Sequence, residues 1–530
     1  MAITGISRKY FPLAGIALAV AGAVNVQAGE WTIEPSLSVT GTASDNIDLH
    51  RTGKVDSYIS QVKPAIDASY LSRRLALEFR ASNNFISYSH DSDNNDDYDV
   101  YELDGNFALW EHGPELFVRA TKDQVQQSIS NNAIADLLTA NATALKQANA
   151  GLSYNLARSD IRMNSTVYFQ RRTSDNEIGD REGVIASLSA ENGSAARQVF
   201  WSATGSFQDL RSVNNNDDSK LYRIDAKIGL INDYRIMPFI RVYEEDNQGD
   251  FASGSNQSSL NSSSWGPGIR WQIGEHLWFD FAYNYVDNEE ENEDHLSGEV
   301  TWRPSPRTAL QAQFSKRFFG DSYGLNFAHQ NKRLSNAISY TETAQSFDRF
   351  NYVEVDLGSF YCPATGDFTL DDCLVAPDSN LSDYVLIPLT TLEPVEADEI
   401  SLQKDLQWRS ELTLPRTIFT LTVSGNRRES LTTGVIDDKY NADFNIRRKL
   451  NSRSNLNYEF SFINNQFDTD NVSGRGGQLD HYRVHTLKYD RTLNNELSGD
   501  ISLRHVDRSS SGTGLDYRES RLELSIKKVF

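Results

Sequence analysis

Apolar and polar residues alternate along most of this chain with a period of two. The clearest stretches are residues 75–81, 161–169, 277–285, 310–314, 440–446 and 456–462. A period of two places successive side chains on opposite faces of a β-strand. The segments run for about ten to fourteen residues, which suits strands that cross a membrane at a tilt. The pattern therefore predicts an all-β fold, a transmembrane antiparallel β-barrel.

The last segment has the same alternation and ends at Phe530. Leu522, Leu524 and Ile526 share its apolar face, and Lys528 interrupts that face where a long side chain can reach the membrane interface. A strand at the edge of a soluble sandwich is the alternative, but it would not explain the same alternation throughout the chain. The segment resembles the closing strand of bacterial outer-membrane barrels, whose C-terminal phenylalanine is part of the signal read by the barrel assembly machinery. We expect Leu522, Leu524, Ile526 and Phe530 to form that insertion signal.

The connections between these segments are alternately short and long. We count eleven short turns, such as 71–73 and 304–305, and twelve longer polar loops, such as 44–56 and 211–218. These connections predict about 24 strands, with about 18–22 as the alternative, and both chain ends on the same side. Outer-membrane barrels have short periplasmic turns and long extracellular loops, so we expect the same orientation here.

Tryptophans support that orientation. Trp110, Trp271, Trp278, Trp302 and Trp408 each lie within a few residues of a short turn. Tryptophan is enriched where a membrane meets water. We therefore expect these residues to form an aromatic girdle on the periplasmic side.

The first 28 residues have the three parts of a secretory signal peptide. Arg8 and Lys9 are basic, an apolar run extends from residue 10 to 24, and the small residue Ala28 precedes the expected cleavage site. We expect residues 1–28 to be removed and residues 29–530 to form a single barrel domain without a plug. No later stretch has enough continuous apolar sequence for a membrane-spanning helix.

The composition fits an exported strand protein and excludes one class of partner. The chain carries 23 Tyr and 26 Phe, which pack well on pleated sheets, and only three Met. Its formal net charge is −22, and it has no basic cluster that would neutralise a phosphate backbone. We therefore expect no nucleic-acid partner.

Two segments depart from the strand pattern. Residues 124–145 are expected to form either a short helix or a constriction loop folded into the lumen. Residues 345–395 make a long acidic loop, and loops of this length are usually functional or disordered. This loop contains both cysteines, Cys362 and Cys373, which are expected to form a local disulfide in an exported protein. We regard the loop as the first candidate for a gate.

The polar faces of the strands predict the lining of the lumen. Both signs of charge occur on these faces, among many Asn, Gln and Ser residues. A lumen of mixed polarity suits hydrated solutes, and no ladder of a single sign selects cations or anions. The expected lumen charges are Glu78, Arg80, Asp225, Arg447, Lys449, Arg521 and Glu523.

The sequence contains no local motif for catalysis or metal binding. His481 and His485 have a zinc-like spacing only on a helix, and on a strand they would lie about 13 Å apart. The acidic loops 91–99 and 287–295 lack the spacing of calcium motifs, but divalent ions bound there would bridge them to lipopolysaccharide. We expect no cofactor and no enzymatic activity. An outer-membrane enzyme whose catalytic residues come from distant strands is the remaining alternative.

The opening of the mature chain resembles a known family. The resemblance rests on residues 31–39 (WTIEPSLSV), 44–49 (SDNIDL), 62–64 (VKP) and 73–88 (RRLALEFRASNNFISY). These segments are similar to the β-barrel porin families, in particular to the outer-membrane barrel associated with exosortase (PEP-CTERM) exopolysaccharide systems. The resemblance implies a location in the outer membrane and a porin-like conduit associated with exopolysaccharide export. A non-conducting surface or scaffold barrel is the alternative.

That resemblance also implies a set of partners. They are outer-membrane lipid and lipopolysaccharide, the barrel assembly machinery, and exopolysaccharide with its export proteins. The resemblance supplies no catalytic residues. The sequence leaves the transported substrate open.

Overall fold

The computed structural model describes residues 29–530, apart from internal gaps. The gaps are 127–131, 135, 140–141, 178, 215–216, 233, 250–259, 275, 287–292, 347, 364–383, 398–399, 432, 469–476 and 513. For residues 348–363 and 384–397, only the backbone is described. The expected signal peptide and the expected Cys362–Cys373 disulfide therefore lie outside what the structure describes.

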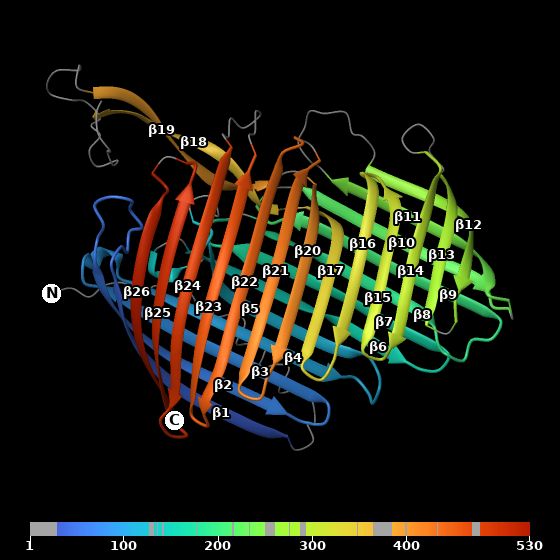
Figure 1. The fold of residues 1–530 in the computed structure, drawn as a ribbon, viewed down its shortest axis with the longest axis horizontal. Helices are drawn as coiled ribbons and strands as arrows, with labels where there is room; N and C mark the ends of the chain where they lie inside the picture. Colours follow the sequence, from blue (N-terminus) through green and yellow to red (C-terminus); the bar gives the residue numbers. More distant parts are fainter. Residues whose placement is uncertain are drawn as a thin grey trace.

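Strands account for most of the described chain (Figure 1). In chain order they are β1 (Glu30–Ser44), β2 (Ser57–Leu71), β3 (Leu75–Tyr88), β4 (Asp96–Ala108), β5 (Glu115–Gln126), β6 (Ala142–Ala157), β7 (Ile161–Ser174), β8 (Arg181–Asn192), β9 (Val199–Ser212), β10 (Asp218–Leu230), β11 (Ile236–Gly249), β12 (Leu260–Gln272), β13 (Leu277–Val286), β14 (His295–Ser305), β15 (Thr308–Arg317), β16 (Gly320–Gln330), β17 (Leu334–Gln345), β18 (Asp348–Pro363), β19 (Tyr384–Ala397), β20 (Ser401–Thr413), β21 (Thr417–Ser430), β22 (Ile436–Asn451), β23 (Ser454–Phe467), β24 (Gln478–Thr492), β25 (Leu497–Ser510) and β26 (Tyr517–Val529). The described residues also include two 3-10 turns, η1 (Ser92–Asn94) and η2 (Leu137–Thr139). Neither of these turns, nor any other helix in the described residues, has the length and hydropathy that a membrane-spanning helix requires.

Twenty-four of the strands form one closed antiparallel sheet. Each strand pairs with its neighbours in the sequence, except that β17 pairs with β20. The pairing of β1 with β26, from Ser36↔Val529 to Ser44↔Arg521, closes the ring. The expectation of an all-β barrel of about 24 antiparallel strands is confirmed.

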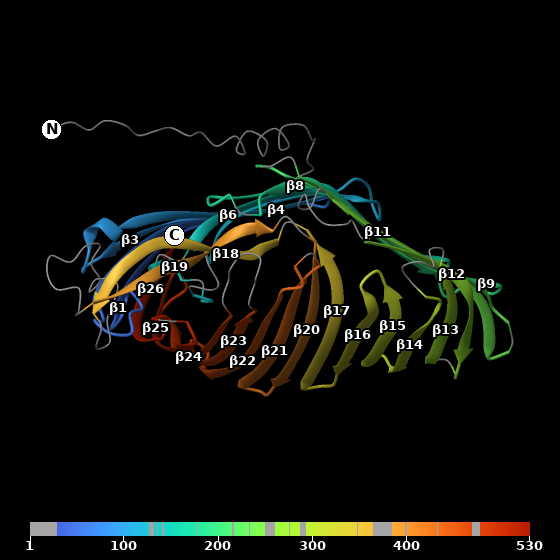
Figure 2. The ribbon, with the colours of Figure 1, turned by 90° about the horizontal axis from the view of Figure 1, so that it is seen from above.

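The long segment 345–395 contains two strands that the alternation of polarity did not predict. β18 and β19 pair with each other in a separate two-stranded sheet. In both views this hairpin extends from the region of β17 and β20 towards β26 and β1, at the end of the ring that carries the long loops (Figures 1 and 2). The segment is therefore a hairpin at the mouth of the barrel and not a plain loop.

The ring is flattened. Figure 2, seen from the long-loop end, shows that it is much wider in one direction than in the other, so that two walls face each other. β9 and β12 lie near one end of the wide direction, and β1 and β26 lie near the other. This shape brings strands that are distant in the sequence close together across the interior.

Short and long connections emerge at opposite ends of the ring, as the sequence predicted. Eleven short turns, such as 72–74 between β2 and β3, lie at the end where the chain terminates (Figure 1). Twelve connections lie at the other end, among them 45–56 between β1 and β2 and the segment that carries the hairpin. By the general rule for outer-membrane barrels, the short turns face the periplasm.

Side chains alternate between an apolar outer face and a polar inner face. On β26, Leu522, Leu524 and Ile526 are 41%, 52% and 57% exposed. Their register partners on β1 and β25 are apolar or glycine. A continuous band of exposed apolar side chains is unfavourable in water and is the surface that lipid covers. The residues that alternate with this band therefore line the lumen.

The expected tryptophan girdle is present with one correction. Five exposed tryptophans lie on the outer face towards the short turns or within one of them: Trp31, Trp110, Trp271, Trp302 and Trp408. A sixth, Trp265, is 50% exposed but lies in the middle of β12. Trp278 points the other way. The register of β13 places Leu277 and Phe279 outside, so Trp278 shares the inner face with Asp280.

Cysteine labelling tests the orientation of the ring. Asp217→Cys, in the connection between β9 and β10, should react with an impermeant maleimide on intact cells, because this connection belongs to the long-loop end. Arg333→Cys, in the turn between β16 and β17, should react only after the outer membrane is opened. The parent protein measures the background from the two native cysteines. The reverse pattern would show that the orientation is inverted.

The closing strand generates a second prediction. Phe530 is 65% exposed, and its N–H donates to the carbonyl of Pro35 on β1 at 2.9 Å. If Phe530 is part of the insertion signal, its deletion should leave an unfolded periplasmic species without heat-modifiable migration on gels. Lys528→Ala, which keeps the terminal residue, is the control and should assemble. Normal heat-modifiable migration of the deletion variant would rule out the signal.

Candidate functional site: the lumen

Contacts between strands that are not neighbours in the ring identify the interior. Lys227 of β10 contacts Asp280 of β13 and Glu299 of β14. Arg317 of β15 contacts Glu245 of β11. Strands three or four places apart make such contacts only on the concave side of a strongly curved sheet. The inner face at this end of the ring is therefore filled by its own side chains.

The first of these contacts is the centre of a buried charge network. The Lys227 ammonium lies 3.1 Å from a carboxylate oxygen of Asp280 and also contacts Glu299. Asp280 accepts two further hydrogen bonds from Arg270, at 2.7 and 2.8 Å. The side chains of Lys227 and Asp280 are 11% and 3% exposed. Each charge is thus compensated by its protein partners in place of water.

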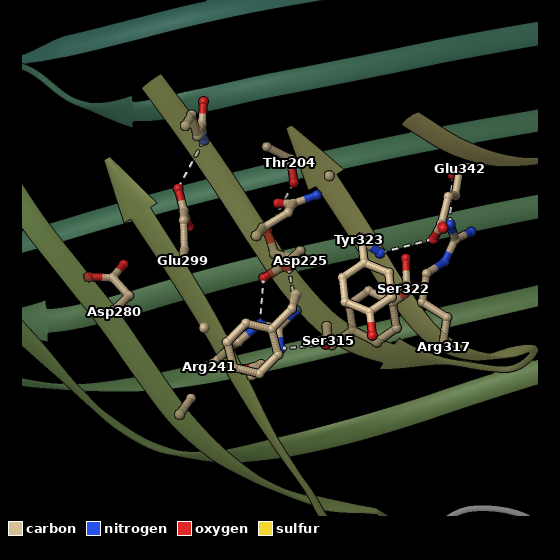
Figure 3. A pocket seen from close by; sticks show the side chains of 18 of the residues that line it. Thr204, Asp225, Arg241, Asp280, Glu299, Ser315, Arg317, Ser322, Tyr323 and Glu342 are labelled. Carbon is tan, nitrogen blue, oxygen red and sulfur yellow. Dashed lines mark hydrogen bonds and ion pairs between the residues drawn. The ribbon is translucent and has the colours of Figure 1, made fainter. Parts of the chain in front are cut away.

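A second network lies beside the first (Figure 3). Arg241 donates to the two carboxylate oxygens of Asp225, at 3.1 and 2.7 Å, and to the hydroxyl of Ser315 on the facing β15 at 3.2 Å. Arg317 donates to Glu245 from its Nε at 2.9 Å. The side chains of Arg241 and Arg317 are each 7% exposed. Together these ion pairs tie β10 and β11 to β15.

A cavity of about 250 Å³ lies against these networks. Its lining adds amide and hydroxyl groups, including Gln313, Asn326 and Thr341. The end of the networks towards the short turns is apolar, with a buried cluster made of Phe200, Met237, Phe239 and Ala282. The guanidinium of Arg270 lies 4.0 Å from the centre of the Phe200 ring and joins the two regions. The polar and apolar parts therefore form one packed corner of the lumen.

The connection between β5 and β6 turns inward at the opposite end of the ring. Asp136 lies 2.5 Å from Arg521 of β26 and 3.5 Å from Arg504 of β25. The backbone N–H of Ala133 donates to the hydroxyl of Tyr482 on β24 at 3.1 Å. Because Arg521 shares the inner face of β26, these contacts hold the connection inside the barrel.

Apolar contacts hold the same connection against β2, β3 and the connection between β1 and β2. Leu138 belongs to a buried cluster with Ile47, Ile59, Ile86 and Tyr88. The Tyr88 hydroxyl also donates to the carbonyl of Leu138 at 3.1 Å. Of the two alternatives for residues 124–145, the described residues support the inward constriction loop, with the single turn η2 as its only helical part. The ends of this segment belong to β5 and β6.

Between the two filled regions, inward-facing charges are open to water. Arg80 is 56% exposed, although its register partner Glu102 and its neighbour Glu78 lie on the same inner face. It contacts Glu102 at 3.0 Å and Glu78 at 3.2 Å. Arg119, which contacts Asp104 at 2.8 Å, is also 56% exposed. Inward side chains this exposed require a water-filled space.

The structure distributes the expected lumen charges over these regions. Glu78 and Arg80 lie in the open part, Asp225 belongs to the Arg241 network, and Arg521 anchors the inward loop. Arg447 and Lys449 lie near the short-turn end of β22 and are exposed, and Glu523 is half-buried on β26. These residues therefore do not converge on one site.

Sequence reasoning identified Asp225 and Arg521 but missed five other charged residues that fill the lumen. They are Asp136, Lys227, Glu245, Asp280 and Arg317. A signal existed for the four strand residues, since each is a charge on the polar face of a strand. Their partners could not be identified, because Lys227 and Asp280, or Glu245 and Arg317, come together only through the curvature of the sheet. In the part of the chain that the structure describes, no group of three or more His, Cys, Asp or Glu side chains has the geometry of a metal site.

Removing one partner of the Arg317–Glu245 pair tests the packed corner. Arg317→Met should lower the free energy of unfolding by about 3–5 kcal/mol, because it leaves a buried carboxylate without its partner. The side chain of Glu245 is 3% exposed. The control is Arg409→Met on β20, where the pair with Glu411 is 57% and 35% exposed, and it should change little. Urea unfolding in lipid vesicles measures both, and equal values would contradict a packed corner.

Comparison with known proteins agrees with this architecture. A family model described as "Putative beta-barrel porin 2" matches residues 20–191, from the end of the expected signal peptide into β8. No curated protein matches the chain.

Among solved structures, similar chains are outer-membrane proteins at low identity. The siderophore receptor PirA from Pseudomonas aeruginosa is 9% identical over 95% of this chain and 81% of its own, with a TM-score of 0.39. The FrpB iron transporter from Neisseria meningitidis (F3-3 variant) is 10% identical over 94% and 81%, with a TM-score of 0.42. OccK8 (OprE) from Pseudomonas aeruginosa is 10% identical over 94% and 98%, with a TM-score of 0.33. The closed ring itself defines the fold. With its apolar outer band and the match to the porin model, it makes this chain a porin-like β-barrel of the outer membrane.

Proposed function

We propose that the protein is a conduit for hydrophilic solutes whose bore is narrowed by the packed corner and by the inward β5–β6 loop. The observation that carries this proposal is the contrast among inward-facing charges. Arg80 and Arg119 are 56% exposed, whereas Arg241 and Arg317 are 7% exposed. A ring filled throughout would bury all four. The exposed pair supports a hydrated passage beside the filled regions.

The lining of this passage favours neutral or weakly charged solutes. Acidic and basic groups are interleaved on the inner faces of β2 to β5, where Asp67, Glu78 and Glu102 surround Arg80. On the facing wall, Lys488 contacts Asp500 at 3.1 Å. Paired charges of both signs give no strong field that would select one ionic sign.

We infer further that the solute is a polysaccharide, exported in an exosortase system. The sequence resemblance of residues 31–88 supports this assignment. The width of the ring supports it too, because side chains just fill a barrel of eight strands and a ring of 24 strands encloses much more space. Amides on the inner faces of β22 and β23 also support it, because Asn441, Asn445 and Asn457 offer donors and acceptors that match sugar hydroxyls. Outer-membrane lipid, lipopolysaccharide, the assembly machinery and the export proteins remain the proposed partners.

A non-conducting surface or scaffold barrel is the second candidate. The observation that favours it is the amount of material at the long-loop end. The inward loop occupies one side there, and the β18–β19 hairpin begins next to Ser346, whose carbonyl accepts a hydrogen bond from Arg181 of β8 at 3.1 Å. This bond joins the start of the hairpin segment to the facing wall. A conduit and a scaffold therefore differ in whether these segments block the bore.

Single-channel recording in planar bilayers separates the two candidates. The intact protein should show a low conductance, and removal of residues 351–394 or release of the inward loop by Asp136→Ala should raise it several-fold. Glu111→Ala, in an exposed pair at the short-turn end, is the control and should behave as the parent. A parent without conductance, with large channels in either variant, would favour the scaffold. Unchanged conductance in both variants would show that neither segment narrows the bore.

A further inference from the structure

On the outer face of β24 to β26, several side chains are polar, although the residue at the same height on the neighbouring strand β23 is aromatic. The register places Phe462, Arg483, Asp507 and Arg518 in one outward row from β23 to β26. The next row towards the short turns is Phe460, His485, His505 and Ser520. The basic residues thus lie at the same height as the outward-facing Phe460 and Phe462 and not in the loops beyond the strands.

These two rows end against the apolar band. The following row is Leu487, Leu503 and Leu522, which are 41%, 51% and 41% exposed. A groove of about 550 Å³ runs along this boundary. Its polar lining includes the two histidines, Ser520 and the carboxylates Asp45 and Asp56, and its apolar lining includes the three leucines. One edge of the groove is therefore polar and the other is apolar. These two edges match the polar headgroup and the apolar acyl chains of a lipid molecule.

The histidines are held in place by aromatic and hydroxyl neighbours. The ring of His485 lies 4.8 Å from the ring of Phe460, and its Nδ1 is 3.0 Å from the hydroxyl of Tyr458. Nδ1 of His505 is 3.0 Å from the hydroxyl of Ser520. Both contacts use Nδ1, so in the described structure Nε2 of each ring is left for a further partner.

Three carboxylates, Asp45, Asp56 and Asp507, lie on or beside this face, and the structure shows protein partners for Asp507 and Asp45. Asp507 accepts from Arg518 at 3.3 Å. Asp45, at the end of β1, accepts from the backbone N–H of Ser520 at 2.6 Å. Arg483 is exposed and makes no ion pair with any residue that the structure describes. An unpaired guanidinium at the level of the lipid band is destabilising unless an anion compensates it.

We propose that Arg483, His485, His505 and Arg518 form a binding site for a phosphate group of lipopolysaccharide. A guanidinium binds phosphate in a bidentate geometry, and imidazole N–H groups add further donors. The acyl chains of the same molecule lie over Leu487, Leu503 and Leu522. The site lies at the long-loop end of the apolar band, and that end meets the outer leaflet in the orientation expected for outer-membrane barrels. This assignment does not depend on whether the lumen conducts.

Native mass spectrometry of the purified full-length protein in micelles tests the site. The probe is lipopolysaccharide with a bisphosphorylated lipid A, added in EDTA so that divalent ions cannot bridge it to acidic loops. The parent should retain one molecule. Arg483→Gln combined with His505→Gln should weaken binding about tenfold or more, as expected for lost charge-assisted hydrogen bonds. Arg483→Gln alone is measured as well, in case the double variant fails to assemble.

The matched control is Arg448→Gln. Arg448 is also exposed and outward-facing, but it lies towards the short-turn end of β22. It should bind lipopolysaccharide as the parent does, and heat-modifiable migration confirms that each variant is folded. Enzymatically dephosphorylated lipopolysaccharide should bind weakly, and equally, to the parent and to the Arg483→Gln variant.

Three outcomes would overturn the proposal. The first is equal binding by the parent and both Arg483 variants, and the second is equal binding of phosphorylated and dephosphorylated lipopolysaccharide. The third is equal retention of phosphatidylglycerol in place of lipopolysaccharide, which would assign the groove to a phospholipid.

Discussion

Every backbone N–H and C=O inside the hydrocarbon layer needs a partner within the protein, and this requirement governs the whole structure. A sheet meets it only if it has no edge. Here the pairing of Ser36–Ser44 with Arg521–Val529 joins the first strand to the last. The ends of the chain are therefore as important as any interior segment, because without that pairing β1 and β26 would expose unpaired backbone to lipid.

Closure with 24 strands creates a second requirement, since a ring of this size encloses far more space than a strand's own side chains fill. The flattened shape meets part of it by bringing β10 and β11 close to β13–β15. Lys227, Asp280, Arg317 and Glu245 then become buried together, each neutralised by a partner. The β5–β6 loop fills the other side through Asp136 and Arg521. What remains between them, lined by Arg80 and Arg119, is the part of the lumen that reaches water.

The outer surface of the ring contacts lipid, so charged groups there also need a compensating partner. Apolar side chains form a band, and polar groups are expected only at its borders. The row with Arg483 and the row with His485 and His505 lie at the levels that Phe462 and Phe460 occupy on β23. A charged row at this depth is explained by a lipid with a phosphorylated headgroup, just as the buried charges inside are explained by each other.

The sequence by itself determined the strand count, the alternation of short and long connections, and the two faces of each strand, because a period of two and the turn residues are local properties. It did not reveal the β18–β19 hairpin, since the length and acidic composition of residues 345–395 predicted a loop. Nor could it reveal which polar side chains meet: Arg241 and Ser315, or Asp136 and Arg521, are brought together by the curvature and flattening of the closed sheet. The filled and open parts of the lumen were decided only by the tertiary structure, because contacts across a barrel depend on its cross-section, which no single strand encodes.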